Sequence, residues 1–145
     1  MKLFVYGTLR PECGHSLGRR LDEVGRACGL GRVYGWLYDF GEFPVAVPDD
    51  ARGSRIVGEV FEIEAEHLFW QTLDEYEDFK PDDAEHSRFR RVEVEVMMDL
   101  GKVFQAQIYW YRLSVKGLTE IKGGDYCKDL RMKEVRRSFA TSTFL

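Results

Sequence analysis

Apolar and polar positions in the first part of the chain predict a buried strand followed by an amphipathic helix. Residues 3–6 form a continuous apolar run that stops at Gly7, which is typical of a short strand that is buried on both faces and ends in a turn. From Gly14 onward the pattern becomes helical. Its apolar positions, and the glycine placed to end the helix, are Leu17, Leu21, Val24 and Gly25. Because the first strand is expected to be buried on both faces, the turn at Gly7 is expected to lie in the interior.

Strand patterns dominate the rest of the chain, with only two further helices. Short runs at residues 33–38, 45–47 and 56–63 predict strands. Residues 91–96 alternate between charged side chains and valine, and a turn at residues 99–101 leads into residues 103–111, which predicts an antiparallel hairpin. Helical patterns cover residues 65–78, which Pro81 closes off, and residues 127–138.

The few helices do not alternate with the strands, and this order favours the α+β class with a largely antiparallel, curved sheet over a doubly wound parallel fold. No repeat, linker or shift in composition divides the 145 residues. We therefore expect one domain over residues 1–145.

Composition and charge narrow the range of partners and compartments. The formal charge is −4, and the basic residues lie in short clusters between acidic segments, which argues against a nucleic-acid-binding face. No apolar stretch approaches the length of a membrane span. The three cysteines, at positions 13, 28 and 127, are widely spaced and show no metal-binding pattern, so a reducing, cytoplasmic compartment is expected.

Familiar cofactor motifs are not found. The three histidines are scattered and have no second ligand at helical spacing, which argues against a metal site. Gly29, Gly31 and Gly35 have the wrong spacing for a dinucleotide fingerprint and precede a strand. We therefore expect neither a metal site nor a dinucleotide-binding site.

The second helix points to a candidate catalytic group. At 100° per residue, Glu77 lies about 40° from Leu73 and inside the apolar stripe that also contains Phe69, Trp70 and Tyr76. Asp74, Glu75 and Asp78 lie about 100° or more away, on the face expected to see water. A carboxyl group held in apolar surroundings has a raised pKa and can exchange protons near neutral pH. The alternative is a helix-end glutamate that bends to solvent or pairs with Arg90.

The turn after the first strand supplies the second half of a candidate site. In Tyr6-Gly7-Thr8-Leu9, a sharp bend at Gly7 would let successive N–H groups converge on one point, as in oxyanion holes. The alternative is a plain strand-ending turn.

Taken together, these segments resemble the γ-glutamylcyclotransferase-like family, which includes the AIG2-like and γ-glutamylamine cyclotransferase-like proteins. The motifs that carry the resemblance are Val5-Tyr6-Gly7-Thr8-Leu9-Arg10, Gly35-Trp36-Leu37-Tyr38-Asp39-Phe40-Gly41 with Phe43-Pro44, Gly58-Glu59-Val60-Phe61, Leu73-Asp74-Glu75-Tyr76-Glu77 and Gly123-Gly124-Asp125-Tyr126. Residues 82–88, and everything beyond Tyr126, match no motif.

The resemblance implies a small, closed or nearly closed β-barrel with flanking helices, and an enzyme without a cofactor. Members cyclise a γ-glutamyl group to 5-oxoproline and release the attached amine or amino acid. By resemblance, residues 6–9 hold the γ-glutamyl group and Glu77 is the general acid/base. Thr8 places the chain nearer the relatives with threonine in this turn than those that act on glutathione.

Two other interpretations remain open. The chain could be a binding or regulatory module that keeps the pocket without turnover. It could also be a hydrolase or transferase in which Glu77 activates water or an external amine.

Cys13 could be read as a nucleophile, but no neighbouring group would activate it, and an ordinary partly buried cysteine is the preferred interpretation. A monomer and a homodimer are equally compatible with the sequence.

Overall fold

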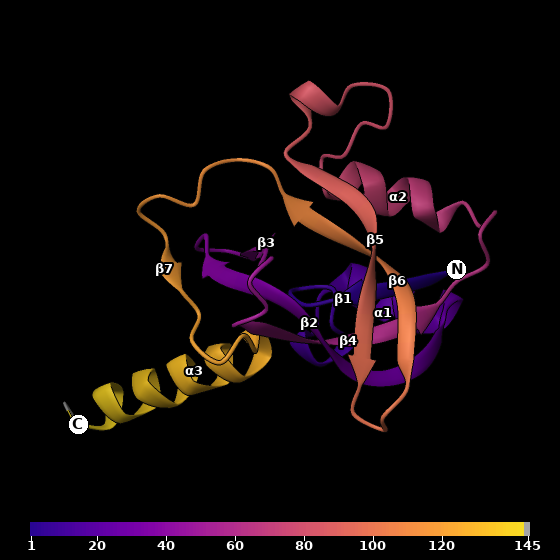
Figure 1. Ribbon diagram of the computed structural model, residues 1–145. Coiled ribbons are helices and arrows are strands. Elements are labelled where there is room, and N and C mark those ends of the chain that lie inside the picture. Colours follow the sequence, from indigo (N-terminus) through magenta and orange to yellow (C-terminus); the bar gives the residue numbers. More distant parts are fainter. Residues whose placement is uncertain (144–145) are drawn as a thin grey trace.

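The computed structural model describes residues 1–143, in which seven strands form one sheet with three α-helices around it (Figure 1). The strands are β1 (Lys2–Val5), β2 (Arg26–Asp39), β3 (Pro44–Pro48), β4 (Arg55–Glu62), β5 (Phe89–Met98), β6 (Val103–Tyr111) and β7 (Thr119–Glu120). The helices are α1 (Ser16–Val24), α2 (Phe69–Tyr76) and α3 (Tyr126–Thr143), with the 3-10 turns η1 (Pro11–Cys13) and η2 (Ala84–His86).

Five strands close into a barrel in the order β2, β4, β1, β6, β5 and back to β2. Neighbouring strands are antiparallel except β1 and β6, which pair in parallel through Leu3 and Gln107. β3 and β7 pair with the second half of β2. The expected α+β fold, a largely antiparallel closed barrel with a few flanking helices, is confirmed.

Barrel closure depends on a part of β2 that the sequence pattern did not reveal. The prediction began this strand at residue 33, whereas it begins at Arg26, and Gly31 pairs with Met98 of β5 where the barrel closes. A Cβ atom at Gly31 would lie 2.7 Å from Cγ1 of Val96. Glycine therefore permits close packing at the closure, and the same lack of side chains hides the alternation of a strand.

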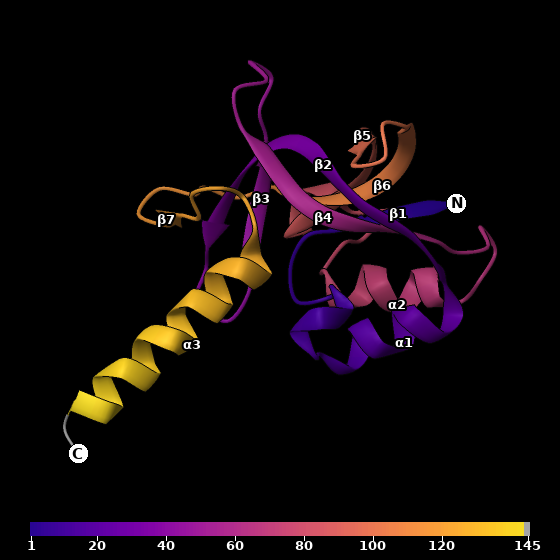
Figure 2. The ribbon, with the colours of Figure 1, turned by 90° about the horizontal axis from the view of Figure 1, so that it is seen from below.

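Two apolar clusters form the core. One fills the barrel and includes Phe4, Ile56, Val60, Ile108 and Trp110. The other lies between the outside of the barrel and the helices α1 and α2, and includes Leu21, Phe61, Phe69, Leu73 and Tyr109. Figure 2 shows α1 and α2 on the same side of the barrel, whereas α3 extends away from it.

Histidine side chains mark the starts of both barrel-packed helices. Nδ1 of His15 accepts a hydrogen bond from the N–H of Leu17 at 3.1 Å, and Nδ1 of His67 accepts one from the N–H of Phe69 at 3.0 Å. His67 lies two residues before α2, and its bond satisfies a free N–H at the start of the helix, which begins at Phe69 and not at residue 65 as expected.

Two of the three cysteines are joined, which differs from the interpretation of Cys13 as an ordinary partly buried cysteine. Cys13 and Cys127 form a disulfide across 114 residues of sequence, and Cys28 is free. The bond ties η1 to the first turn of α3. Spacing along the chain could not reveal it because the pairing depends only on closeness in space. A reducing compartment therefore no longer follows from the cysteines.

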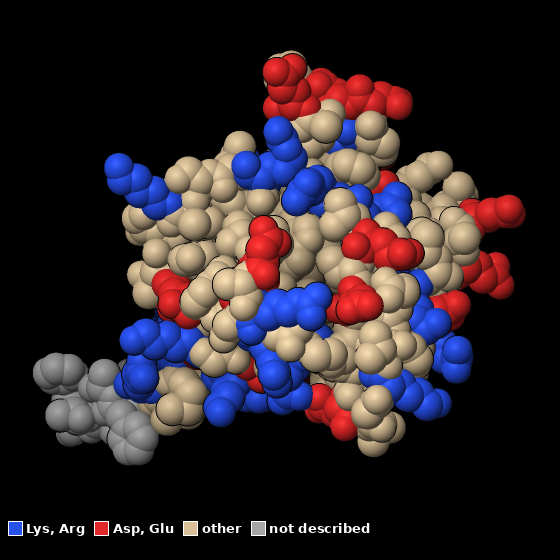
Figure 3. All heavy atoms as spheres, in the orientation of Figure 1, with Lys and Arg blue, Asp and Glu red and all other residues tan. Residues whose placement is uncertain are grey.

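Charged side chains of both signs are spread over the face seen in Figure 3. Acidic side chains gather on the segment between α2 and β5, which contains Asp82, Asp83 and Glu85. Basic side chains gather toward α3. None of the helices described within residues 1–143 is both long and apolar enough to cross a membrane.

Candidate active site

A cavity of about 280 Å³ lies between the turn that follows β1 and the end of α2. The residues that line it are Phe4, Val5, Tyr6, Gly7, Thr8, Leu9, Glu42, Phe43, Pro44, Tyr76, Glu77, Asp78, Arg88, Phe89 and Tyr109. All five residues that the sequence pointed to, Tyr6, Gly7, Thr8, Leu9 and Glu77, are among them. The fold therefore brings the two halves of the candidate site to one cavity.

The turn that borders this cavity contains backbone donors without a backbone acceptor in the described part of the chain. The N–H of Arg10 donates to the carbonyl of Gly7 at 3.0 Å, which closes the turn, and Leu9 is buried in the outer core. Within residues 1–143, no backbone carbonyl accepts from the N–H of Thr8 or Leu9. Two successive N–H groups without a backbone acceptor in a cavity wall are suited to bind an anionic oxygen.

Gly7 is required at the turn for space. Its φ is not in the left-handed region, but a Cβ atom there would lie 2.7 Å from Cγ of Pro44. The sharp bend expected from the conformational freedom of glycine is therefore not what requires Gly7; the close approach of Pro44 is. Pro44 begins β3, so β3 packs directly against the turn.

The far end of the turn is anchored by a buried arginine. Arg10 is 3% exposed, and its Nη1 donates to Oδ1 of Asp125 at 2.9 Å while Nη2 pairs with Glu12. Asp125 also accepts from the N–H of Lys128 in the first turn of α3 at 3.1 Å. Together with the disulfide, these contacts fix the turn against the start of α3.

Glu77 ends α2 with its carboxyl in apolar surroundings. Its N–H donates to the carbonyl of Leu73 at 2.9 Å, and Asp78 then takes a left-handed conformation (φ 51°) that stops the helix. Glu77 is half-buried as a whole residue, and burial of its carboxyl raises the pKa from 4.5 to about 8. Among the described residues, none forms a hydrogen bond or ion pair with this carboxyl, so the alternative pairing with Arg90 does not occur.

The helix pattern placed two neighbours of Glu77 on the wrong face. Asp74, expected in water, is 9% exposed, and Tyr76, expected in the apolar stripe, is 41% exposed. Asp74 is buried because Arg91 from β5 and Tyr109 from β6 bind its carboxylate. Partners on other strands offset the cost of burying this charge, and the spacing along one helix does not show them.

Two tyrosines link the turn, the barrel and α2. The hydroxyl of Tyr6 donates to the carbonyl of Tyr109 at 2.7 Å, and the hydroxyl of Tyr109 donates to Oδ1 of Asp74 at 2.6 Å. Burial raises the pKa of Tyr6, and the nearby Glu77 raises it further. Burial and the hydrogen bond to Asp74 raise the pKa of Tyr109. Both phenols therefore stay protonated and act as donors.

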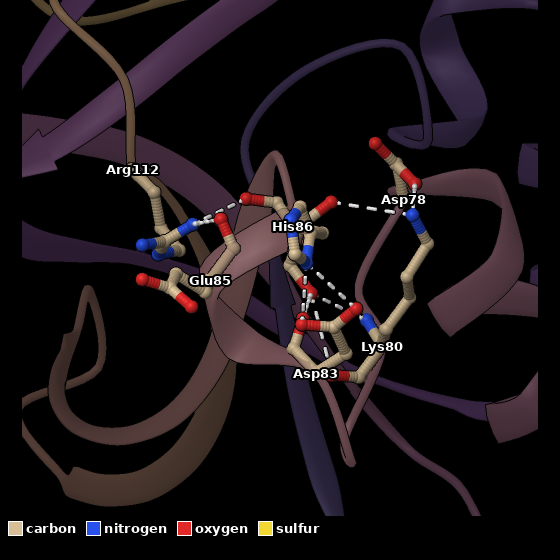
Figure 4. Close-up of polar contacts among 7 residues, drawn as sticks. Asp78, Lys80, Asp83, Glu85, His86 and Arg112 are labelled. Atoms are coloured by element: carbon tan, nitrogen blue, oxygen red, sulfur yellow. Dashed lines mark hydrogen bonds and ion pairs between the residues drawn. The ribbon is translucent and has the colours of Figure 1, made fainter.

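The segment between Glu77 and β5, which contributes Asp78 and Arg88 to the cavity wall, folds back on itself (Figure 4). Its base is closed by a hydrogen bond from the N–H of Arg88 to the carbonyl of Asp78 at 2.9 Å. Inside it, Nζ of Lys80 donates to the carbonyl of His86 at 3.2 Å, and Nη1 of Arg112 donates to the carbonyl of Ser87 at 2.6 Å. These contacts hold the chain in place on the C-terminal side of Glu77.

A model for one protein family matches most of this sequence. The family is described as gamma-glutamyl cyclotransferase, AIG2-like, and the match covers residues 3–128. The chain belongs to this family. The family membership expected from the motifs is therefore confirmed.

Individual relatives agree with the family match. A protein of Halalkalibacterium halodurans, whose name assigns it provisionally to the gamma-glutamylcyclotransferases, is 45% identical over 60 residues, which are 41% of this chain and 51% of that protein. The crystal structure of YkqA from Bacillus subtilis is similar with a TM-score of 0.68 and 27% identity, over 92% of this chain and 42% of that one. This chain thus spans about half the length, or less, of these two relatives.

A mouse protein shares the fold at lower sequence identity. The crystal structure of this AIG2-like protein from Mus musculus is similar with a TM-score of 0.65 and 21% identity, over 86% of each chain. The barrel and its helices are therefore common to bacterial and mammalian proteins.

Proposed function

We propose that this chain is a γ-glutamyl cyclotransferase, which converts a γ-glutamyl amine or γ-glutamyl amino acid to 5-oxoproline and the free amine. The observation that carries the proposal is the position of Glu77. Its carboxyl has no protein partner among the described residues, is desolvated, and shares a cavity with two backbone N–H groups that have no carbonyl acceptor.

In the proposed reaction Glu77 moves protons between the two nitrogens of the substrate. The α-ammonium group gives a proton to the Glu77 carboxylate, and the resulting amine attacks the γ-carbonyl carbon to form the ring C–N bond. The bond to the leaving nitrogen then breaks as Glu77 returns a proton to it. On becoming the lactam N–H, the ammonium group loses two protons, and the leaving nitrogen gains two if it departs as ammonium, so protons balance.

The raised pKa suits this role. In the free protein the Glu77 carboxyl is mostly protonated at pH 7, because its pKa is about 8. A bound α-ammonium group would favour the ionised form, since an opposite charge lowers the pKa of a carboxyl. A group whose pKa lies near the working pH can both accept and return a proton, and proton transfer of this kind contributes about 10² to 10⁴ in rate.

The turn is assigned to binding and charge stabilisation. The N–H groups of Thr8 and Leu9 would donate to the oxygen of the γ-carbonyl as it becomes negative. Tyr6, whose phenol is buried, and Gly7, which leaves room for Pro44, would shape the wall against which the γ-glutamyl group curls. Holding the chain curled brings the amine close to its own γ-carbonyl and adds to the rate through proximity.

The test is release of 5-oxoproline, detected by mass, from γ-glutamyl amino acids, γ-glutamyl-ε-lysine and glutathione. We expect release by the wild type and a loss of at least about 10²-fold in kcat for Glu77→Gln. Glu75→Gln is the matched control, because it is an exposed glutamate on α2 outside the cavity. If no panel member yields 5-oxoproline but one is hydrolysed, external water is the nucleophile. Binding without any release would instead favour a binding module.

A further inference from the structure

A buried cluster beside the cavity connects the two halves of the candidate site through one residue. Tyr109 accepts the hydroxyl of Tyr6 at its backbone carbonyl (2.7 Å) and donates its own hydroxyl to Asp74 (2.6 Å). Tyr109 is 3% exposed and lines the cavity. The turn after β1 and the helix α2 are therefore both held by β6.

Asp74 is bound by three donor atoms. Besides the Tyr109 hydroxyl, Nε of Arg91 donates to Oδ1 at 2.9 Å and Nη2 of Arg91 donates to Oδ2 at 3.2 Å. The guanidinium also lies over the ring of Trp70, 5.0 Å from its centroid, and Nη1 donates to Gln107 at 3.3 Å. This geometry is a bidentate pairing of the Arg91 guanidinium with the carboxyl group of Asp74.

Asp74 lies one helical step before Glu77. Residues three apart on a helix are neighbours, with Cβ atoms about 5–6 Å apart. The carbonyl of Asp74 also accepts the N–H of Phe79 at 2.9 Å, and this backbone bond spans Glu77. Burial is the cause of the raised pKa of Glu77.

We propose that Tyr109, Asp74 and Arg91 form a positioning unit for Glu77. Tyr109 sets where α2, and with it Glu77, lies relative to the turn, because it binds Tyr6 at the start of the turn and Asp74 on α2. The balance of charge between Asp74 and Arg91 sets how readily Glu77 ionises. The inference rests on the proposed role of Glu77 in proton transfer.

Other charged or titratable groups also border the same cavity. They are unchanged in variants of Asp74 and Arg91, so their effect on the ionisation of Glu77 is the same in each of those variants. They are Tyr6, Glu42, Tyr76, Asp78 and Arg88. A change confined to the Asp74–Arg91 pair therefore reports on that pair.

The first experiment follows the ionisation of Glu77 without turnover, by NMR titration of glutamate side-chain carboxyl carbons, with the Glu77 signal assigned from its loss in Glu77→Gln. Asp74→Asn leaves the Arg91 charge uncompensated and should lower the Glu77 midpoint by about one pH unit. Arg91→Gln leaves the Asp74 charge uncompensated and should raise it by a similar amount. The double variant restores neutrality and should return the midpoint toward that of the wild type.

The second experiment uses kinetics to test Tyr109. Tyr109→Phe keeps the ring in the cavity wall and removes only the bond to Asp74, so kcat should fall about tenfold while KM stays within about twofold. Tyr111→Phe is the matched control. It is a buried tyrosine on the same strand, outside the cavity, and its hydroxyl has no hydrogen bond among the described residues.

Opposite shifts in the two single variants, with recovery in the double variant, support the unit, since loss of folded protein alone cannot move a titration midpoint in two directions. If the Glu77 titration midpoints of the variants equal that of the wild type, the proposed effect of the Asp74–Arg91 charges on Glu77 is wrong. If kcat of Tyr109→Phe equals kcat of Tyr111→Phe, the proposed role of Tyr109 in positioning Glu77 is wrong. The titration remains valid if no 5-oxoproline is ever released, so failure of the proposed function is seen separately. If Asp74→Asn does not fold, Arg91→Gln and the double variant still decide the result.

Discussion

The hydroxyl groups of Thr8 and Tyr76 lie 3.1 Å apart and connect the turn after β1 to the last residue of α2. Both residues line the cavity. The hydrogen bond is exposed, so it competes with water and contributes little to stability. Its place between the two halves of the candidate site gives it a larger effect on substrate binding than on folding.

Removing this bond should therefore separate activity from stability. In Tyr76→Phe we expect kcat/KM for 5-oxoproline release to fall about threefold and the free energy of unfolding to change by less than about 1 kcal/mol. Tyr34→Phe, on β2 away from the cavity, is the control and should match the wild type. Equal losses in both variants would contradict a specific role for the Thr8–Tyr76 contact.

Burial of Glu77 should make the protein less stable as pH rises. The unfolded carboxyl ionises above about pH 4.5, whereas the folded one keeps its proton until about pH 8. The unfolded state then binds fewer protons, and stability falls by up to about 1.4 kcal/mol per pH unit in this window. The Glu77→Gln variant has no ionisable group at this position. Its free energy of unfolding, measured in urea, should therefore exceed that of the wild type by a difference that grows between pH 5 and pH 8 to about 2–4 kcal/mol. A difference that does not change with pH would mean that the carboxyl is hydrated.

The same group should shape the pH dependence of the reaction. If the ionised carboxylate of the free enzyme starts the reaction, kcat/KM should rise about tenfold per pH unit up to a midpoint near pH 8. Initial rates at low substrate concentration between pH 5.5 and pH 9.5 measure this profile. A profile that is already flat above pH 6 would contradict a desolvated Glu77.

Gly7 should resist substitution because of a single contact. In Gly7→Ala the new Cβ would lie 2.7 Å from Cγ of Pro44, and we expect a loss of about 1–3 kcal/mol in stability together with weaker activity. Gly53→Ala, where a Cβ would lie 3.6 Å from Asp49, is the control and should change stability by less than about 1 kcal/mol. Adding Pro44→Ala to Gly7→Ala removes the clashing atoms and should recover part of the loss. No recovery would mean that the backbone at Gly7, and not space, is limiting.

The disulfide should stabilise the fold through the long loop that it closes. Cys13 and Cys127 are 114 residues apart, and a bond of this span is expected to contribute about 2–4 kcal/mol. Thermal unfolding of Cys13→Ser/Cys127→Ser should begin at a lower temperature than that of the wild type without reductant, and reductant should bring the wild type to the level of the variant. Cys28→Ser, at the free cysteine, is the control. Two titratable thiols at positions 13 and 127 in protein purified without reductant would contradict the pairing.

The periodicity of the sequence by itself determined most of the helices and strands, because the side chains that each one buries recur at the spacing typical of that element. The apolar run of β1, the helical spacing of α1 and the alternation along β5 and β6 each correspond to an observed element. Family motifs added the closed barrel. The angle of Glu77 relative to Leu73 also directed attention to the carboxyl that the fold desolvates.

Tertiary structure alone decided the features that depend on partners from distant segments. Asp74 is buried because Arg91 and Tyr109 bind its carboxylate, and a helical wheel contains neither. Gly7 is needed because of Pro44, a residue of another strand. The Cys13–Cys127 bond likewise joins segments at opposite ends of the chain. The physical reason is common to all three: local spacing fixes which face of an element a side chain occupies, whereas the free energy of burying it depends on what the fold brings against that face.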